Sequence, residues 1–360
     1  MAMGDAATSS DPPAAMHETP RPRPRLWRRL WRGAVATVTC ATLLGIVLGF
    51  IGQSLRDRNL LLALLMYVPI VPLGLVALLL DLARRGRALR PRFVLTAIGS
   101  TGVLVGAIPM LGMKPPDAAV AGGDPLTLLH WNMQSGGRWA AQPRWERAAE
   151  QILSRQPDVI VLSEAPPDHW LFHSLHKNGR GYKTVHISNQ PDSRYWYKPL
   201  VCSRWPMVME GQVPVRNGVA MAVAVRVRRR PLRLLVVDGV SQVTVLRTPF
   251  LEDVARACDA AATEGRPFDV VVGDFNAPGR SVGFDAVRSA GGGYKRASDY
   301  SGGWRGTWPV PLPVYDIDHV LMRPDAAVKG CEMFTSLRLD TDHRGQFVTL
   351  ALPPVAGAPR

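Results

Sequence analysis

Three long apolar runs without a charged residue lie close together near the N-terminus. They are Gly33–Leu55, Asn59–Leu80 and Phe93–Met113, with lengths of 23, 22 and 21 residues. A helix of about 20 predominantly apolar residues spans the hydrocarbon core of a bilayer, so each run is long enough to cross a membrane. Buried helices of a soluble core are the alternative. Three runs separated only by short charged loops favour three transmembrane helices, at about 33–55, 59–80 and 93–113.

Arginine residues are distributed unevenly around these runs. Residues 21–32 contain six arginines and the second loop contains five, whereas the first loop is only Arg56–Asp57–Arg58. By the positive-inside rule, the N-terminal tail and the second loop are cytoplasmic and the first loop lies outside. The chain after about Lys114 is then extracytoplasmic. A cleaved signal peptide fits less well, because the first run is long and further runs follow.

The excess positive charge of the chain is concentrated near these runs. Residues 1–120 contain 14 of the 43 Lys and Arg residues but only 6 of the 29 Asp and Glu residues. We expect residues 1–32, rich in Pro, Ala and Ser at the start, to form a disordered basic cytoplasmic tail that contacts anionic lipids rather than nucleic acid. The four cysteines have no zinc-site spacing. A disulfide among Cys202, Cys258 and Cys331 is left open.

A single domain is predicted after a linker at 114–124, over about residues 125–354. Helical spacing is found at Pro143–Gln156 and Phe250–Gly265. Strand-like apolar stretches are more numerous: Leu126–Met133, Asp158–Ala165, Gly218–Val227, Pro231–Val240, Asp269–Asn276, Asp316–Arg323 and Gln346–Leu352. The excess of strands predicts a mixed α/β sandwich with helices outside two stacked sheets.

Polar side chains occur where the apolar stretches stop. They are Asn132, Glu164, Asp274, Asn276, Asp318, Asp342 and His343. Taken singly, each is more often a turn or strand cap than a ligand. Together they form an oxygen-rich set without thiolate, which suits a hard cation such as Mg²⁺ or Mn²⁺. Phosphoester hydrolysis requires such a cation, an acid–base pair and donors to the developing charge.

These residues carry a family resemblance. The succession HWNMQSG, DVIVLSEAP, CSRWPM, VVVGDFNAP, GTWP, YDIDHVL and TDHRG resembles the endonuclease/exonuclease/phosphatase superfamily over about residues 125–352. With the three preceding apolar runs, the whole chain resembles the VanJ-type membrane proteins associated with teicoplanin resistance. The superfamily resemblance implies a four-layer α/β/β/α sandwich and phosphoester hydrolysis that depends on Mg²⁺ or Mn²⁺.

The resemblance also implies a metal site. Glu164 would be the principal ligand, with Asn132 beside it, and Asp342 would complete the environment of this or a second metal. One position departs from the family pattern: many members have His or Asn on the central strand where this chain has Asp238. An anionic side chain cannot donate to phosphate unless it is protonated. Asp238 is therefore either a further ligand, a contact for a cationic group or a polar core residue.

The remaining residues receive catalytic roles from the resemblance. Asp274 would orient or deprotonate the attacking water, and Asn276 would hold a phosphoryl oxygen. His343 would contact the phosphate, held in orientation by Asp318. Residues acting in this way would make the protein a hydrolase of phosphoric ester bonds.

The substrate class follows from topology rather than from the motifs. A domain tethered outside the membrane encounters phospholipid headgroups and lipid-linked intermediates of the cell envelope, which favours a lipid-linked phosphoester. An extracytoplasmic nuclease is the main alternative, and Trp304 and Trp308 would then stack on bases, although core packing is the commoner role of such residues. The domain has little excess positive charge, and its RVRRR cluster at Arg226–Arg230 is interpreted as a solvated strand end or a lipid-headgroup contact, so the nucleic-acid signal is weak. A non-catalytic membrane scaffold is the second alternative, and the near-complete motif set disfavours it.

Overall fold

The computed structural model describes residues 25–84, 92–118, 125–134, 142–165, 175, 181–186, 199–227, 230–336, 338 and 340–353. Two compact units, Met1–Ala41 and Thr42–Arg360, make up the chain. Helix α1 (Arg25–Leu55) crosses the boundary between them. Residues 1–24 of the expected tail, most of the second loop, residues 119–124 of the expected linker and residue 354 lie outside the described residues.

The N-terminal helices differ in detail from the three expected spans. Helix α1 starts at Arg25, eight residues before the first apolar run, because no proline follows Pro24 in the RLWRRLWR stretch to interrupt it. The second run forms two helices, α2 (Leu60–Met66) and α3 (Ile70–Arg84), and the third forms α4 (Arg92–Ala107) followed by the 3-10 helix η1 (Ile108–Met110).

Among the described residues, one helix, Leu26–Leu55, has the length and hydropathy to cross a membrane by itself. Helices α2 and α3 pass the same test only as a pair, with a bend of 51° between them. The bend falls at Pro69, which has no backbone N–H to continue the helix. The apolar helix at Val94–Met110 is shorter than a full span.

Helices α3 and α4 pack closely through two glycines. A Cβ atom on Gly74 would lie 2.6 Å from the carbonyl oxygen of Gly99, and one on Gly99 would lie 2.9 Å from the carbonyl oxygen of Gly74. Near the other end of this pair, the Thr96 hydroxyl donates to Asp81 Oδ2 at 2.6 Å. Small residues at a helix contact and an interhelical hydrogen bond are typical of helices packed in a membrane.

Two six-stranded sheets follow these helices. The first, here called the β8 sheet, has the order β10 (Lys295–Arg296), β12 (Asp318–Met322), β9 (Val270–Asp274), β8 (Arg230–Gly239), β7 (Gly218–Val227) and β6 (Met207–Gln212). The second, the β2 sheet, has the order β13 (Ala327–Phe334), β14 (Gly345–Ala351), β2 (Pro125–Asn132), β3 (Val159–Ser163), β5 (Leu200–Ser203) and β4 (Lys183–His186). A two-stranded sheet pairs β1 (Leu111–Gly112) with β11 (Gly303–Trp304).

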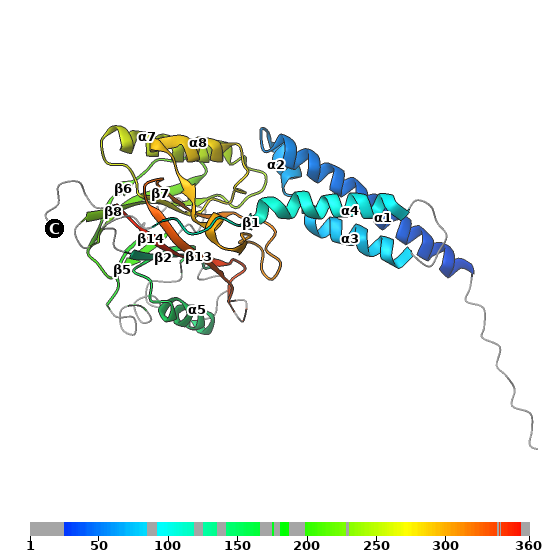
Figure 1. Ribbon diagram of the computed structural model, residues 1–360, viewed down its shortest axis with the longest axis horizontal. Coiled ribbons are helices and arrows are strands. Elements are labelled where there is room, and N and C mark those ends of the chain that lie inside the picture. The colour runs from blue at the N-terminus through cyan, green and yellow to red at the C-terminus, as the bar shows by residue number, and fades with distance from the viewer. Residues whose placement is uncertain are drawn as a thin grey trace, which may run out of the picture. The chain divides into compact units, whose positions relative to one another are not determined.

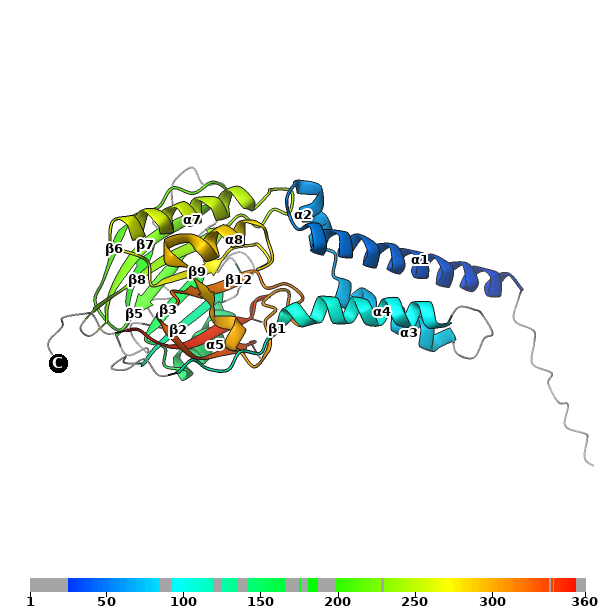
Figure 2. The same ribbon diagram turned by 45° about the horizontal axis from the view of Figure 1, so that its top comes forward.

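Helices cover the outer face of each sheet. Helices α7 (Thr248–Thr263) and α8 (Gly283–Ser289) lie on the β8 sheet, and α5 (Gln142–Ser154) lies on the β2 sheet (Figures 1 and 2). Short 3-10 turns η3 (Ala290–Gly292) and η4 (Ala297–Tyr300) complete the domain. Successive side chains of β8 point to opposite faces of its sheet, which explains the layers. Leu234 and Val236 face the β2 sheet, whereas Leu235 and Val237 pack under α7. The expected α/β sandwich is confirmed.

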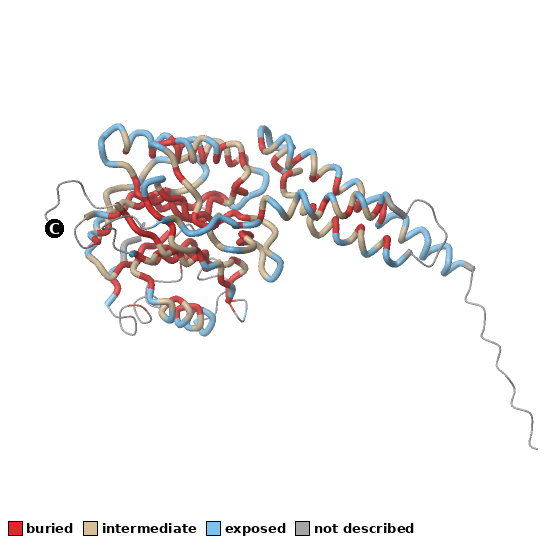
Figure 3. The backbone as a smooth tube through the Cα atoms, in the orientation of Figure 1, coloured by how far each residue is buried: buried red, intermediate tan, exposed pale blue. Residues whose placement is uncertain are grey.

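Burial follows this layering, with the buried residues concentrated on the strands of the two sheets (Figure 3). One core cluster fills the space between the sheets, and two more lie under the helices on either side. The buried cysteines Cys331, Cys258 and Cys202 belong to three different clusters and are all free thiols. The disulfide left open by the sequence is therefore not formed among them.

Candidate active site

The ends of the central strands meet at one edge of the sandwich. In the β2 sheet, β2 ends at Asn132, which is in register with Ser163, and Glu164 follows directly. In the β8 sheet, the register pairs Asp274 with Asp238 on one side and with Asp318 on the other. Because β2 and β3 are parallel, as are β8 and β9, their carboxyl ends lie at the same edge. The topology thus gathers side chains from both sheets.

Asn132 connects the two sheets at this edge. Its Nδ2 atom donates to Glu164 Oε1 at 3.2 Å and to Asp274 Oδ2 at 2.8 Å. Its Oδ1 atom accepts a hydrogen bond from the backbone N–H of Gln134 at 2.7 Å. The amide nitrogen therefore faces the two carboxylates and brings them together. A role for Asn132 as a metal ligand, which requires its oxygen, stays a prediction.

Asp318 and His343 form a buried pair. His343 Nδ1 lies 2.8 Å from Asp318 Oδ2, and both side chains are at most 7% exposed. The hydroxyl of Thr307 accepts from the backbone N–H of Asp318 at 3.2 Å, which fixes the backbone that carries this carboxylate. With Nδ1 engaged, the Nε2 atom of the imidazole remains for a group in the pocket.

Asp342 lies beside this pair and is the more accessible carboxylate. Its Oδ1 atom is 3.8 Å from His343 Nε2, and its Oδ2 atom accepts from the indole N–H of Trp308 at 2.9 Å. Trp308 therefore positions an acidic side chain in this structure. The expectation that Trp308 serves either stacking or core packing misses this contact.

Backbone strain is concentrated around the same residues. Gln134, Glu164 and Asn276 have φ values of 52°, 48° and 47°, in the left-handed region that residues other than glycine seldom occupy. The hydrogen bond from the Asn276 backbone N–H to Asp274 Oδ1, at 2.7 Å, holds one of these turns. Strained backbone held by its surroundings is characteristic of functional sites.

A pocket of about 550 Å³ opens at this edge. Five of the predicted site residues line it: Glu164, Asp274, Asn276, Asp342 and His343. The other three, Asn132, Asp238 and Asp318, lie behind the lining and are at most 1% exposed. The structure therefore brings all eight sequence-predicted residues to one place, in a lining layer and a supporting layer.

The acidic residues carry more negative charge than the site offsets. Burial and the charge of Asp318 raise the pKa of Asp274 to about 8. Burial, followed by the charges of Asp274, Glu164 and Asp318, raises the pKa of Asp238 well above its usual value. Neither carboxylate oxygen of Asp238 has a hydrogen bond of ordinary geometry to the described residues. Converging oxygen donors of this kind fit a hard divalent cation.

In the Asp318–His343 pair, by contrast, the pKa shifts favour the charged form of both partners. Burial disfavours the imidazolium of His343, but the charge and hydrogen bond of Asp318 outweigh it and raise the pKa of His343 to about 10. The charge and hydrogen bond of His343 likewise overcome burial and lower the pKa of Asp318. Asp274, Asp318 and His343 each place a potential ligand atom within 4.8 Å of the others. Because Nδ1 of His343 is hydrogen-bonded to Asp318, we interpret this group as an acid–base pair beside a carboxylate.

Sequence reasoning missed several residues of the site. His130 is fully buried between the sheets, 3.2 Å from Ser163 Oγ and 4.0 Å from Asp318 Oδ1, and burial lowers its pKa to about 4. In the sequence, only the polar residues within the HWN stretch at 130–132 and the LSE stretch at 162–164 indicate this contact. Tyr67 and Pro69 also line the pocket, although they belong to the second apolar run. No local sequence pattern predicts that Tyr67 and Pro69 line the pocket.

The fold and this site define an α/β/β/α sandwich protein with a carboxylate–histidine pocket at the ends of its central strands. The chain belongs to the Endonuclease/Exonuclease/phosphatase family, whose model matches residues 129–343. Members of this family are phosphoester hydrolases. No curated protein matches the chain.

Solved structures with the same fold include two bacterial proteins. An endonuclease/exonuclease/phosphatase family protein from Bacteroides thetaiotaomicron is 14% identical with a TM-score of 0.51, over 64% of this chain and 99% of that one. A functionally unknown conserved protein from Enterococcus faecalis V583 is 12% identical with a TM-score of 0.50, over 63% and 99%. At these identities the likeness extends to the fold alone. About a third of the chain lies outside this likeness.

Proposed function

We propose that the protein is a membrane-anchored, divalent-metal-dependent phosphoester hydrolase that acts at the outer membrane face, on a lipid-linked or phospholipid phosphoester. One observation carries this proposal: a pocket of about 550 Å³ has Glu164, Asp274, Asn276, Asp342 and His343 in its lining. Hydrolysis breaks one P–O ester bond as water adds to phosphorus. It requires a proton acceptor for the water and positive charge near the phosphoryl oxygens.

Each lining residue has a distinct role in this proposal. Asp274 accepts the proton of the attacking water. Its pKa, about 8 without metal, would be lowered by a cation bound beside it, which would leave the carboxylate ionised for this role. His343, held through Nδ1 by Asp318, presents Nε2 to a phosphoryl oxygen. Asn276 orients the same group from the strained turn after β9. Water activation and charge stabilisation are thus assigned to different residues of one cluster.

Glu164 and Asp342, with Asp238 behind them, would hold a Mg²⁺ or Mn²⁺ ion. These residues supply hard oxygen donors, and neither oxygen of the buried Asp238 carboxyl has a hydrogen bond of ordinary geometry to the described residues. A cation bound there would polarise a phosphoryl oxygen of the substrate. Asn132 keeps Glu164 and Asp274 close enough to share that cation.

Multi-pass membrane insertion is part of the proposal. Large apolar side chains are exposed along the N-terminal helices, including Leu44, Leu61, Leu79 and Leu104, each 57% exposed or more. Arg56 donates to Asp285 Oδ2 at 2.6 Å, and Asp57 Oδ1 accepts from the Val282 N–H at 2.6 Å. Both contacts support a first loop on the same side of the membrane as the sandwich. The arginine distribution assigns that side to the exterior.

A nuclease function is less well supported. Arg247 is the only basic residue other than His343 among the described residues lining the pocket, and its guanidinium donates to the carbonyls of Gln242, Val245 and Asn276. A pocket that binds a nucleic-acid backbone requires several cationic groups directed at phosphates. A role in the cell envelope or in teicoplanin resistance, which the VanJ-type resemblance implies, is consistent with a lipid-linked substrate and is proposed with it.

The hydrolase proposal is tested with a soluble phosphodiester, bis(p-nitrophenyl) phosphate, and Mg²⁺. Glu164→Gln preserves shape and removes a ligand charge, so turnover should fall by at least about 10²-fold, and EDTA should abolish wild-type turnover. Glu332→Gln, at an exposed carboxylate paired with Arg155, is the matched control and should keep full activity. Undiminished turnover in EDTA would contradict the proposal.

The membrane orientation is tested separately. An alkaline phosphatase reporter fused after residue 120 should be active outside the cytoplasm, and a reporter that functions only in the cytoplasm should be silent at the same point. The reverse pattern would remove both the orientation and the argument for a lipid substrate at the outer face.

A further inference from the structure

The catalytic pocket has apolar lining that the hydrolytic chemistry does not require. Besides the carboxylates and His343, its lining includes Pro69, Val243, Pro309, Val314 and Ile317. A phosphate and its cation need only the polar groups. A pocket of about 550 Å³ that offers both polar and apolar lining suits a ligand that has both kinds of surface.

Two exposed apolar side chains belong to the pocket lining or to a loop that contributes to it. In the described part of the chain after Met113, only three large hydrophobic side chains are exposed: Val208 (63%), Val243 (52%) and Leu312 (73%). Val243 lines the pocket, and Leu312 lies in the loop between the lining residues Pro309 and Val314. Exposed apolar residues in or beside a cavity lining indicate an apolar ligand or surface.

The turn between α2 and α3 builds part of the same pocket. The Tyr67 and Tyr315 rings pack edge to face with centroids 5.4 Å apart, and the Tyr315 hydroxyl donates to the Tyr67 carbonyl. Tyr315 in turn stacks on Trp308 at 5.7 Å. A continuous aromatic contact therefore leads from the helical turn to the residue that holds Asp342. The proposed membrane segment is a wall of the active site and not merely its tether.

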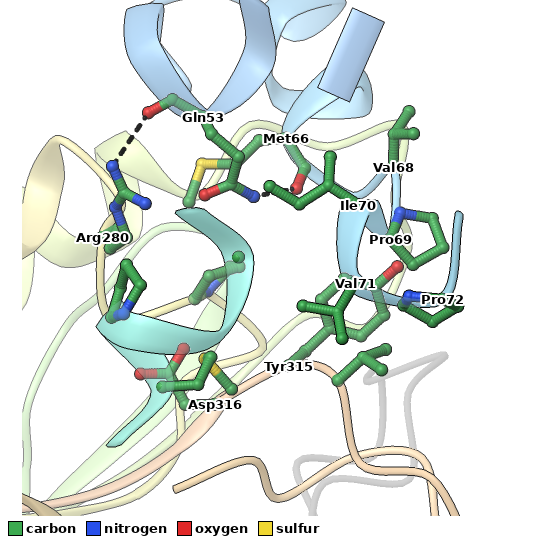
Figure 4. Close-up of a pocket in the computed structure, with 15 residues that line it drawn as sticks. Gln53, Met66, Val68, Pro69, Ile70, Val71, Pro72, Arg280, Tyr315 and Asp316 are labelled. Atoms are coloured by element: carbon green, nitrogen blue, oxygen red, sulfur yellow. Dashed lines mark hydrogen bonds between the residues drawn. The ribbon is translucent and has the colours of Figure 1, made fainter. Parts of the chain in front are cut away.

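A second, smaller cavity of about 40 Å³ continues the apolar surface along this turn. It shares Pro69, Val314 and Tyr315 with the catalytic pocket. Figure 4 shows it bordered by Val68–Pro72 on the helical side and by Tyr315 and Asp316 on the sandwich side. The apolar path thus runs from the phosphate end, past Tyr315, to residues of the second apolar run.

We infer that this apolar lining, from Pro69 to Val243 and the adjoining loop at Leu312, is a binding subsite for the hydrocarbon chain of a membrane lipid whose headgroup phosphoester lies at the carboxylates and His343. The inference rests on the proposed hydrolase function and names the part of the substrate that the pocket selects. The lipid enters from the side of the α2–α3 turn. The phosphate then reaches Asp274 and His343 without leaving the membrane surface completely.

The test uses the full-length protein in phospholipid nanodiscs with Mg²⁺ and two substrates, ethyl and octyl p-nitrophenyl phosphate. The reacting ester and the leaving group are identical, so only chain length differs. Because each buried CH₂ contributes about threefold to fourfold, we expect kcat/KM for the octyl ester to exceed that for the ethyl ester at least tenfold. Val243→Asn and Leu312→Asn should lower this ratio several-fold.

Val208→Asn is the matched control, since Val208 is equally exposed but lies on the edge strand β6. Partition of the octyl chain into the nanodisc is common to all variants, so a difference between variants reports the subsite. A ratio that Val243→Asn, Leu312→Asn and Val208→Asn leave equally unchanged would overturn the inference. If the ethyl ester were still hydrolysed in a Glu164-dependent manner, the hydrolase function would survive that result.

Binding provides a readout independent of turnover. With Mg²⁺ present, octylphosphonate, which has no ester bond to hydrolyse, should bind the wild-type protein at least tenfold more tightly than ethylphosphonate in calorimetric titrations. Introducing Val243→Asn into that protein should reduce the preference. Equal affinities for the two phosphonates would reject the chain subsite even if no ester were hydrolysed.

Discussion

The hydroxyl of Tyr67 donates to the backbone carbonyl of Asn276 at 2.9 Å, so a residue of the helical turn holds the strained residue two positions after Asp274. Arg247 Nε donates to the same carbonyl at 3.1 Å. The position of Asn276 therefore depends on the N-terminal helices as well as on the sandwich. This contact yields the first prediction.

Tyr67→Phe should lower turnover by roughly tenfold, because the Asn276 carbonyl loses one of its two donors and small displacements of catalytic groups are costly. Tyr294→Phe is the matched control, since its hydroxyl donates to the Phe268 carbonyl at 3.0 Å away from the site. Each variant should lose about 1–3 kcal/mol of stability. Turnover and thermal unfolding measured on both variants separate the effects, and equal turnover would show that the Tyr67 contact is structural only.

The Asp318–His343 pair is expected to act as a unit. Asp318→Asn should leave the fold intact but remove the group that fixes the imidazole, lowering turnover by about 10²–10⁴-fold. His343→Ala should cost at least as much, and the double variant little more than His343→Ala alone. Asp325→Asn, at an exposed carboxylate paired with Arg323, is the control. Strictly additive losses, or lower melting temperatures with normal specific activity, would exclude the pair from the mechanism.

Stability without metal should fall as pH rises. The pKa of Asp274 is about 8 in the folded protein, against 3.8 ordinarily, so between pH 4 and 8 the folded state retains a proton that the unfolded chain releases. His343, at about 10 against 6.5, acts in the same direction at higher pH. Melting temperatures in EDTA should therefore decrease from pH 5 to pH 8, and less steeply for Asp274→Asn. Mg²⁺ should stabilise more at pH 8 than at pH 5 and release protons on binding near neutrality.

Asp238 should respond differently from a paired buried carboxylate. Asp238→Asn removes a buried acid whose oxygens have no ordinary hydrogen bond, so the metal-free protein should melt at an equal or higher temperature. If Asp238 contributes to the cation site, the same change should weaken Mg²⁺ binding. Asp253→Asn offers the contrast, since Asp253 is bonded to Arg216 and Arg256 and its variant should melt lower. A large destabilisation by Asp238→Asn would assign it to core structure.

The central strands were predictable because both of their faces are buried. Asp269–Asn276 and Pro231–Val240 are nearly continuous apolar stretches, and the structure has β9 and β8 there. Strands β6 and β13 were not predicted, because they lie at sheet edges, are only partly buried and contain charged residues such as Glu210 and Glu332.

The bend between α2 and α3 was not predictable either. Pro69 is apparent in the sequence, but whether a proline bends or breaks a helix depends on contacts far along the chain.

The site residues likewise divide into those that the local sequence identifies and those that only tertiary contacts bring to the site. Glu164, Asp274 and His343 were identifiable as polar residues at the ends of apolar stretches, where burial without a partner is costly. His130 resembles an ordinary alternating residue of β2, and only the packing of the second sheet gives it a neighbour in Asp318. Tyr67 lies about 200 residues before Asn276, so their contact exists only in the folded protein.

The contact between Gly74 and Gly99 has a consequence for genetics. Any side chain at either position would force α3 away from α4, and the turn at Tyr67–Pro69, which begins α3, would shift with it. A library of random variants selected for loss of turnover should therefore return substitutions at these two glycines alongside those at Glu164. Such alleles would look like defects of membrane assembly, yet their lesion would be a displaced wall of the pocket.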